Sequence, residues 1–210
     1  MKLKRLTALL LSVTMAPTLA ACGGGGDPKD DSASGDLSGK TIIIGNITPV
    51  TGAQAAYGLA ITNSIQLAID EINAAGGILG ATVKLSTKDD QGTPAEAVSG
   101  FNSLLSEGAS AIIGATLSSC TSAITSLADD EGIVLVTPSS TADSITTKAD
   151  YVFRSCFKDS FQGEMVAAYA KDQGWTKAAV LYATGDTYSS GLHDSFVKAA
   201  EKYGIEIVCE

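Results

Sequence analysis

The chain has a single histidine, His193, and its four cysteines include no C-x-x-C pair. Zinc sites are built mainly from histidine and cysteine at short spacings, so we expect no metal site. The sequence also contains no G-x-S-x-G elbow, H-E-x-x-H motif or Walker loop, which mark common classes of hydrolases and nucleotide-binding enzymes. Because few groups remain for general-base chemistry, we expect neither catalysis nor a cofactor.

Basic residues are scarce as well, with 14 lysines and arginines against 23 acidic residues and a formal net charge of −9. Residues 1–21 carry three of the positive charges and no negative one, so residues 22–210 have a net charge of −12. Such a surface repels phosphates and argues against nucleic acid as a partner, but it does not exclude a small zwitterion. The hydrophobic fraction of 45% is ordinary for a protein that packs a core.

The apolar run near the N-terminus, from Leu6 to about Ala16, is too short to cross a membrane as a helix. Three positively charged residues precede this run, and the stretch after it ends in the small residues Ala20 and Ala21. A charged start, a hydrophobic middle and a small-residue end are the build of a secretory signal peptide, which we therefore predict over residues 1–21.

The junction Leu19-Ala20-Ala21-Cys22 resembles the lipobox of bacterial lipoproteins. In that family the signal is cut before the cysteine, which then carries lipid. The resemblance implies that Cys22 is lipidated and that the mature chain is anchored to a membrane, facing outside the cytoplasm at the cell surface or in the periplasm. The alternative is an ordinary signal peptide in which Cys22 is incidental.

Four glycines follow Cys22, and the residues up to Lys40 are rich in Asp, Ser, Gly and Lys. A stretch that buries so little apolar surface does not offset its ordering entropy, so residues 22–40 are expected to form a flexible linker. Beyond it lie Cys120, Cys156 and Cys209. One disulfide is allowed outside the cytoplasm, and Cys120–Cys156 is the pair we favour. The alternative, three small buried thiols, stays open.

The remainder alternates between short apolar runs and amphipathic stretches. The apolar runs predict strands at 41–45, 82–86, 111–114, 133–136, 151–154, 178–183 and 205–209. Apolar residues at helical spacing predict helices at 55–75, from Pro94 onward, and at 118–130, 160–173 and 189–203. In the first helix the predicted buried face consists of Ile61, Ile65, Ala68 and Ile72. The alternation predicts an α/β fold with a doubly wound, mostly parallel sheet, in which ligands bind beyond the carboxyl ends of the strands.

Several segments carry a more specific likeness by their order and spacing: Gly45–Gly52, Asp70–Ile78, Asp130–Thr141, Tyr151–Arg154 and Asp186–Tyr188. Together they resemble the branched-chain amino-acid binding proteins, the type 1 periplasmic binding proteins that serve ABC importers as substrate-binding lipoproteins. The resemblance implies a first ligand-binding lobe over residues 41–157 and the start of a second α/β lobe over 158–210. Because the family's second lobe continues further, we expect the chain to be an N-terminal portion of a longer protein.

The same resemblance implies a function. The family binds leucine, isoleucine, valine or another amino acid in a cleft between its lobes, and delivers it to the membrane permease of an ABC transporter. The alternative is a ligand-sensing domain of a signalling system, since receptors use the same two-lobed fold. No cofactor is implied by either function.

A free amino acid presents a carboxylate that needs donors and an ammonium that needs acceptors. Ser118 is predicted where a strand feeds a helix, so its hydroxyl and the following N–H groups can meet an anion at the helix's positive end. The Ser139 carbonyl and the Thr141 hydroxyl offer acceptors. By resemblance, Ser118 and Thr141 bind the carboxylate, while Ser139 and Thr141 hold the ammonium. The alternatives are a plain N-cap at Ser118 and a polar turn at 139–141.

Two tyrosines, Tyr57 and Tyr188, are expected to shape the pocket for the ligand's side chain, because an aromatic ring gives an apolar wall with a polar tip. The resemblance places them on opposite sides of the ligand. The alternative is that each packs locally beside its own helix. Asp186 is expected to cap the helix that follows it rather than to contact ligand.

Overall fold

The computed structural model describes residues 35–147 and 149–210. The predicted signal peptide, Cys22 and most of the predicted linker lie outside these residues. Within the described ranges, no helix is long and apolar enough to cross a membrane.

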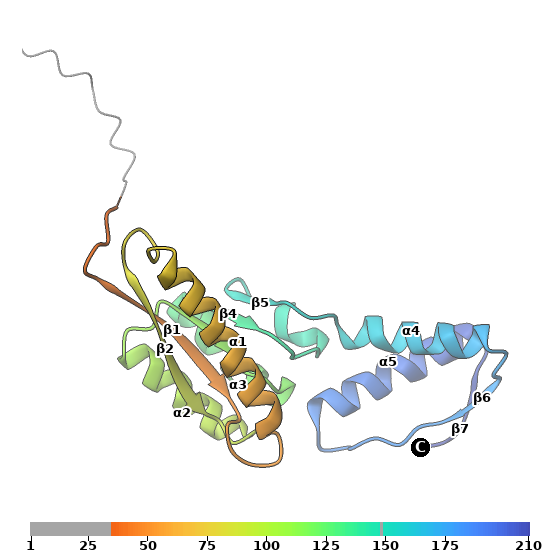
Figure 1. The fold of residues 1–210 in the computed structure, drawn as a ribbon. Helices are drawn as coiled ribbons and strands as arrows, with labels where there is room; N and C mark the ends of the chain where they lie inside the picture. The colour runs from red at the N-terminus through yellow and green to blue at the C-terminus, as the bar shows by residue number, and fades with distance from the viewer. Residues whose placement is uncertain (1–34, 148) are drawn as a thin grey trace, which may run out of the picture. The chain divides into compact units, whose positions relative to one another are not determined.

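A five-stranded parallel sheet forms the centre of the first part of the chain (Figure 1). Its strands are β1 (Thr41–Thr48), β2 (Thr82–Asp89), β3 (Ala111–Gly114), β4 (Val134–Thr137) and β5 (Val152–Arg154), in the order β2-β1-β3-β4-β5. Ile44 of β1 lies opposite Leu85 on one side and Ala111 on the other, so β1 and β3 are neighbours. The chain leaves these two strands in opposite directions, and such a switch point opens a crevice at the strands' carboxyl ends.

Helices cover both faces of this sheet. We call the sheet and these helices together the sheet lobe. The helices are α1 (Ala55–Ala74), α2 (Pro94–Ser106) and α3 (Ser118–Glu131). Ile112 joins the core cluster of α2 and α3, whereas the next residue, Ile113, packs with the cluster of α1. Because successive side chains of a strand point to opposite faces, α1 lies on one face and α2 and α3 on the other. The predicted doubly wound α/β fold is confirmed.

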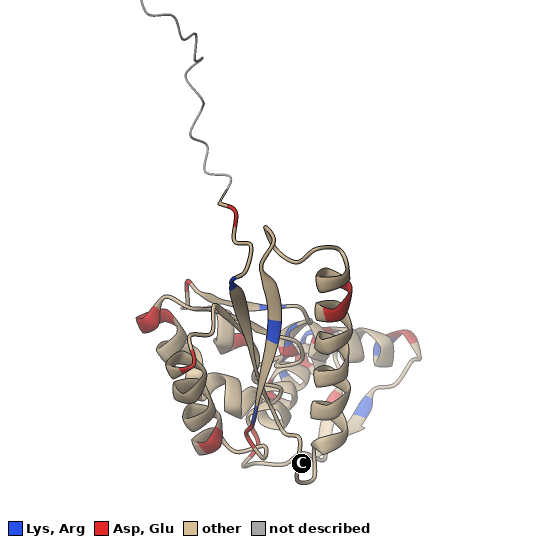
Figure 2. Ribbon diagram, turned by 60° about the vertical axis from the view of Figure 1, so that its left-hand side comes forward, with Lys and Arg blue, Asp and Glu red and all other residues tan. Residues whose placement is uncertain are grey.

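The local sequence explains where these helices begin and end. Thr93 caps α2 by accepting a hydrogen bond from the Glu96 N–H at 3.4 Å, with Pro94 as the first helical residue. Gly132 ends α3 in the left-handed conformation at a φ of 62°. Figure 2 shows acidic residues on the helices that flank the sheet, as the net negative charge leads one to expect.

The predicted buried face of α1 is wrong in part. Ile65 is buried, but Ala68 and Ile72 are exposed and Ile69 is buried in their place at 4% exposure. The real contact stripe runs through Gly58, Ile65 and Ile69. Gly58 decides it, because a Cβ there would lie 1.9 Å from the Pro49 carbonyl oxygen, so this side of the helix presses against backbone.

Beyond β5 and the short 3₁₀ helix η1 (Asp143–Thr146) lies a second α/β pattern, which we call the C-terminal segment. It consists of α4 (Asp159–Asp172), β6 (Lys177–Ala179), α5 (Thr187–Tyr203) and β7 (Glu206–Cys209). The helices pack through alanines, and β6 pairs in parallel with β7. The strand predicted at 178–183 is shorter, because the pairing ends near Val180 and Leu181 is fully exposed.

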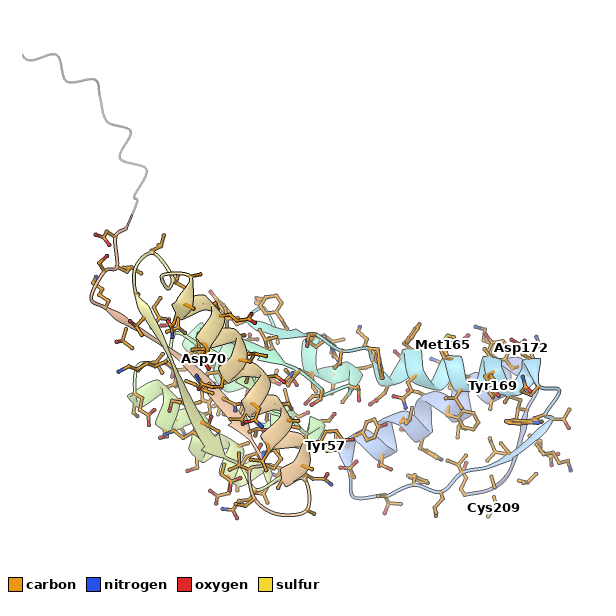
Figure 3. The ribbon with its side chains drawn as sticks, viewed as in Figure 1. Tyr57, Asp70, Met165, Tyr169, Asp172 and Cys209 are labelled. Carbon is orange, nitrogen blue, oxygen red and sulfur yellow. The ribbon has the colours of Figure 1, made fainter. Side chains whose placement is uncertain are left out.

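One face of α4 carries large apolar side chains that are more than half exposed: Phe161, Met165 and Tyr169. Figure 3 shows Met165 and Tyr169 projecting from this helix. The rings of Trp175 and Tyr169 pack edge to face, with their centroids 5.8 Å apart.

The favoured disulfide between Cys120 and Cys156 is not formed, since Cys120, Cys156 and Cys209 are all free thiols. Cys120 faces the core of the sheet lobe and is fully buried. The Cys156 thiol instead donates to the Ser140 carbonyl at 3.5 Å. The two thiols therefore lie in different environments, one in the core of the sheet lobe and the other beside the loop after β4.

Candidate ligand-binding site

A pocket of about 410 Å³ lies at the carboxyl ends of β1, β3 and β4. All five residues that the sequence proposed as ligand contacts line it: Tyr57, Ser118, Ser139, Thr141 and Tyr188. Six further residues complete the lining: Gln54, Thr116, Leu117, Phe157, Gln162 and Asp186. The pocket therefore joins three loops of the sheet lobe to the starts of α4 and α5.

Ser118 lies at the start of α3 but does not cap it. The N-cap is Leu117, in an extended conformation and without a side-chain cap, so the alternative of a plain N-cap at Ser118 is wrong. The Ser118 side chain is 3% exposed, and its oxygen accepts a hydrogen bond from the Ala142 N–H at 3.4 Å. The first N–H groups of a helix have no partner within it, so a hydroxyl and helical N–H groups meet here as potential anion donors.

The loop after β4 presents acceptors to the same pocket. The Ser139 hydroxyl donates to the Thr116 carbonyl at 2.6 Å, so this hydroxyl is already engaged within the protein. Thr141 is 6% exposed, and its hydroxyl oxygen has no hydrogen-bond partner in the part of the chain that the structure describes. A buried hydroxyl without a partner costs free energy, so the hydrogen-bonding capacity of Thr141 is unused among the described residues.

Asp159, the first residue of α4, is an acidic group beside this loop that the sequence did not single out as a site residue. Its carboxylate is 1% exposed, and neither oxygen has a partner among the described residues. Burial raises its pKa, while the nearby Thr141 hydroxyl and the Arg154 charge act in the opposite direction. An acidic residue directly after a strand-to-helix crossover was the available signal, but sequence alone gave no reason to expect it to be buried.

The two tyrosines stand at the entrance of the pocket. Tyr57 is 62% exposed and lies in the first turn of α1, where Figure 3 labels it. Tyr188 is 40% exposed in the first turn of α5, and its hydroxyl accepts from Gln162 Nε2 at 3.4 Å. Phe157, which is 55% exposed, adds a third aromatic wall that sequence reasoning missed.

Asp186 caps α5 as the sequence predicted. Its Oδ1 accepts a hydrogen bond from the Ser189 N–H at 2.7 Å. Its side chain also lines the pocket. In the described residues, no group of three His, Cys, Asp or Glu side chains has the arrangement of a metal site. The polar residues of this pocket thus include Ser118 at the start of α3 and Ser139 and Thr141 after β4, with aromatic side chains beside them.

This geometry can be compared with known proteins. A family model of periplasmic binding proteins matches residues 41–210. The chain belongs to this family. The family predicted from the sequence segments is thereby confirmed.

Relatives of this periplasmic binding protein include proteins that are named for the amino acids they bind. The Leu/Ile/Val-binding protein BraC3 of Rhizobium johnstonii is 35% identical over 170 residues, which are 80% of this chain and 46% of that protein. A leucine-, isoleucine-, valine-, threonine- and alanine-binding protein of Pseudomonas aeruginosa is 31% identical over 176 residues, 83% of this chain and 47% of that protein. The chain spans about half the length of the curated relatives it matches.

Solved structures resemble it as well. The branched-chain amino acid transporter substrate-binding protein LivJ of Streptococcus pneumoniae, in complex with isoleucine, has a TM-score of 0.76 and 37% identity, covering 81% of this chain and 49% of that chain. A leucine-binding protein of Thermotoga maritima has a TM-score of 0.75 and 30% identity, covering 80% of this chain and 48% of that chain.

Proposed function

We propose that this chain belongs to an extracytoplasmic substrate-binding protein of an ABC importer that captures a free α-amino acid. The observation that carries the proposal is the pocket itself, which brings Ser118 together with Ser139 and Thr141. Donors and acceptors at these positions match the two ends of a zwitterion. Each charge-assisted hydrogen bond contributes roughly 1.5–3 kcal/mol, so a few such bonds support binding without any chemistry on the ligand.

A branched-chain amino acid is the ligand we favour. Tyr57, Phe157 and Tyr188 provide apolar surface at the pocket entrance. The names of the relatives point the same way, because they refer to leucine, isoleucine and valine. The function proposed is therefore binding and delivery, not catalysis.

The proposed mechanism is capture by closure. The amino acid binds first to the loops of the sheet lobe, and the second lobe closes over it through the crossover between β5 and α4. Tyr188 and Asp186 then approach from the side of α5. The closed form docks on the permease subunits in the membrane, and lipid on Cys22 keeps the protein near them.

A binding screen tests the function. Isothermal titration of the natural full-length protein against the twenty amino acids is expected to give tight binding of one or more branched-chain amino acids. A double variant, Ser118→Ala with Thr141→Ala, is expected to lose that binding. Ser64→Ala is the matched control, because among the described residues this exposed hydroxyl bonds only to the Ala60 carbonyl of its own helix. Binding of no amino acid by the wild-type protein would refute the proposal.

The anchor is tested separately. The intact mass of the native protein extracted from membranes is expected to correspond to a chain that begins at Cys22 and carries lipid. A Cys22→Ala variant is expected to appear in the soluble fraction. A native mass without added lipid contradicts the anchor but leaves amino-acid binding unaffected.

A further inference from the structure

Three buried hydroxyl groups lie behind the pocket and not in its lining: Thr121, Thr137 and Ser140. The Ala115 carbonyl accepts from Thr121 at 2.9 Å, from Thr137 at 2.8 Å and from Ser140 at 3.1 Å. The side chain of Ser140 is also 2.6 Å from the hydroxyl of Thr121. These contacts tie the loop after β3 to the loop after β4 and to α3.

Ser140 is the member of this cluster that belongs to the loop after β4 and contacts the loop after β3. Its hydroxyl reaches the carbonyls of residues 115 and 116, at the start of the turn that leads to Ser118. Its own backbone lies between Ser139 and Thr141, the proposed ammonium acceptors. Arg154 Nη1 donates to the Ser140 carbonyl at 3.2 Å, so the residue is held from both sides.

The bonds of Ser140 are not needed to satisfy the two carbonyls. The Ala115 carbonyl already accepts from Thr121 and Thr137, and the Thr116 carbonyl accepts from Ser139. Removal of the Ser140 hydroxyl therefore leaves neither buried carbonyl without a partner, and the usual large cost of an orphaned group does not arise. What the hydroxyl adds is a further link between the two loops, beside the Ser139–Thr116 and Ala142–Ser118 hydrogen bonds.

The distance between the two loops matters for a ligand with two charged ends. In an α-amino acid the carboxylate and the ammonium are attached to the same carbon, whereas in a β-amino acid one additional carbon separates them. We propose that Ser140, together with Thr121, is a positioning residue that sets the spacing between the carboxylate and ammonium sites. It thereby makes the pocket selective for α-amino acids over β-amino acids. The inference rests on the proposed function.

Titration of the natural full-length protein with leucine and with β-leucine tests this selectivity. In Ser140→Ala the ratio of the two affinities is expected to fall about tenfold, because leucine binding weakens while β-leucine gains room. Thr125→Ala is the matched control, since in the part of the chain that the structure describes its hydroxyl bonds only to the Thr121 carbonyl within α3, at 2.9 Å. The control is expected to keep the wild-type ratio. Weakening of both ligands by the same factor overturns the inference.

Amide hydrogen exchange of the ligand-free protein tests the tie without any amino acid. Amides 116–118 and 141–142 are expected to exchange faster in Ser140→Ala than in the wild type or in Thr125→Ala. Equal exchange in all three proteins overturns the inference. If the wild-type protein binds no amino acid, the proposed function fails, and the exchange result still decides whether Ser140 holds the loops.

A second pair of variants serves if Ser140→Ala does not fold. Thr121→Val keeps the side-chain shape and removes the hydroxyl that contacts Ser140, whereas Thr121→Ser keeps the hydroxyl. Thr121→Val is expected to lower the leucine-to-β-leucine ratio, and Thr121→Ser is expected to restore it. An unchanged ratio in Thr121→Val counts against the inference.

Discussion

The backbone N–H of Asp159 donates a hydrogen bond of 3.0 Å to the carbonyl of Thr141. This bond joins the first residue of α4 to the loop that we propose to hold the ligand's ammonium. It places a buried carboxylate next to a buried hydroxyl, and both have oxygens without partners among the residues described. Asp159 does not line the pocket, whereas Thr141 does, so the negative charge of this carboxylate would act on a ligand cation across the Thr141 loop and not by direct contact.

The first prediction concerns this carboxylate. Asp159→Asn is expected to weaken amino-acid binding about tenfold, because the ammonium loses a nearby negative charge. Binding of 4-methylpentanoate, which has no ammonium, is expected to change little. Asp172→Asn, at the other end of the same helix, is the control. Equal losses for leucine and 4-methylpentanoate would show that Asp159 has only a structural role.

The pKa of Asp159 gives the same site a pH dependence. Burial raises the pKa of Asp159 in the folded protein. Above the raised pKa the ionised carboxylate therefore destabilises the fold. This cost to stability is lost as pH falls from the raised pKa to the ordinary one. Binding should follow the opposite course, because protonation removes the charge that attracts the ammonium. We expect leucine affinity to decline on acidification in the wild type and less so in Asp159→Asn. Titrations between pH 4 and 8, a range that spans roughly the ordinary pKa values of carboxyl groups and histidine, check this expectation.

A second prediction concerns Asp89, at the end of β2, which holds the turn before α1. Its carboxylate accepts hydrogen bonds from the N–H groups of Val50 at 2.9 Å and Gln91 at 3.0 Å, and from the Thr51 hydroxyl at 2.5 Å. Burial alone would raise its pKa, but these hydrogen bonds outweigh burial and lower it. The stability that the carboxylate contributes is therefore present above its ordinary pKa and lost as pH falls through the lowered value.

Asp89→Asn is accordingly expected to cost about 1 kcal/mol at neutral pH and almost nothing in acid. Thermal unfolding midpoints of the variant and the wild type, measured across that pH range, test the expectation. Asp130→Asn is an exposed control in α3 and should leave the midpoint unchanged. A constant difference at every pH would show that the carboxylate's charge is not involved.

A third prediction tests the buried face of α1. Ile69→Ala is expected to destabilise the protein by about 2–5 kcal/mol, since it removes a well-buried side chain. Leu67→Ala, in the same helix but 61% exposed, is expected to cost far less. Ile72→Ala, 38% exposed, should fall between them. Denaturant unfolding of the three variants measures the order, and a larger loss in Ile72→Ala than in Ile69→Ala would contradict the structure.

A fourth prediction concerns the thiols. Burial, and then the negative charge of Asp90, raise the pKa of Cys120 to about 12, and the thiolate is the form that reacts. Iodoacetamide at neutral pH is expected to label the exposed Cys209 first and Cys120 only after unfolding. Peptide mass spectrometry over time gives the order. Protection of both Cys120 and Cys156 that only a reductant removes would instead reveal the disulfide that the structure lacks.

Much of the fold follows from the sequence. Short apolar runs such as 111–114, and helical spacings such as Ala97, Phe101 and Leu104, are periodic patterns that can be read from neighbouring residues alone. The three residues of α2 are buried, and so are those on one face of β3. The order of strands and helices then predicts that a ligand binds at the carboxyl end of the sheet. The five proposed contact residues meet around one pocket because that rule applies to loops, whose place along the chain is visible.

Other features depend on which surfaces meet in space. The α1 stripe shifted to Ile69 because Gly58 presses on the Pro49 carbonyl, a contact no spacing reveals. Cys120 stayed free because it faces the core. Asp159 became a buried acid beside Thr141 through a backbone bond between residues eighteen positions apart. Sequence determined the alternating elements, since their periods are local, whereas burial and pairing depend on distant residues and were decided only by the tertiary structure.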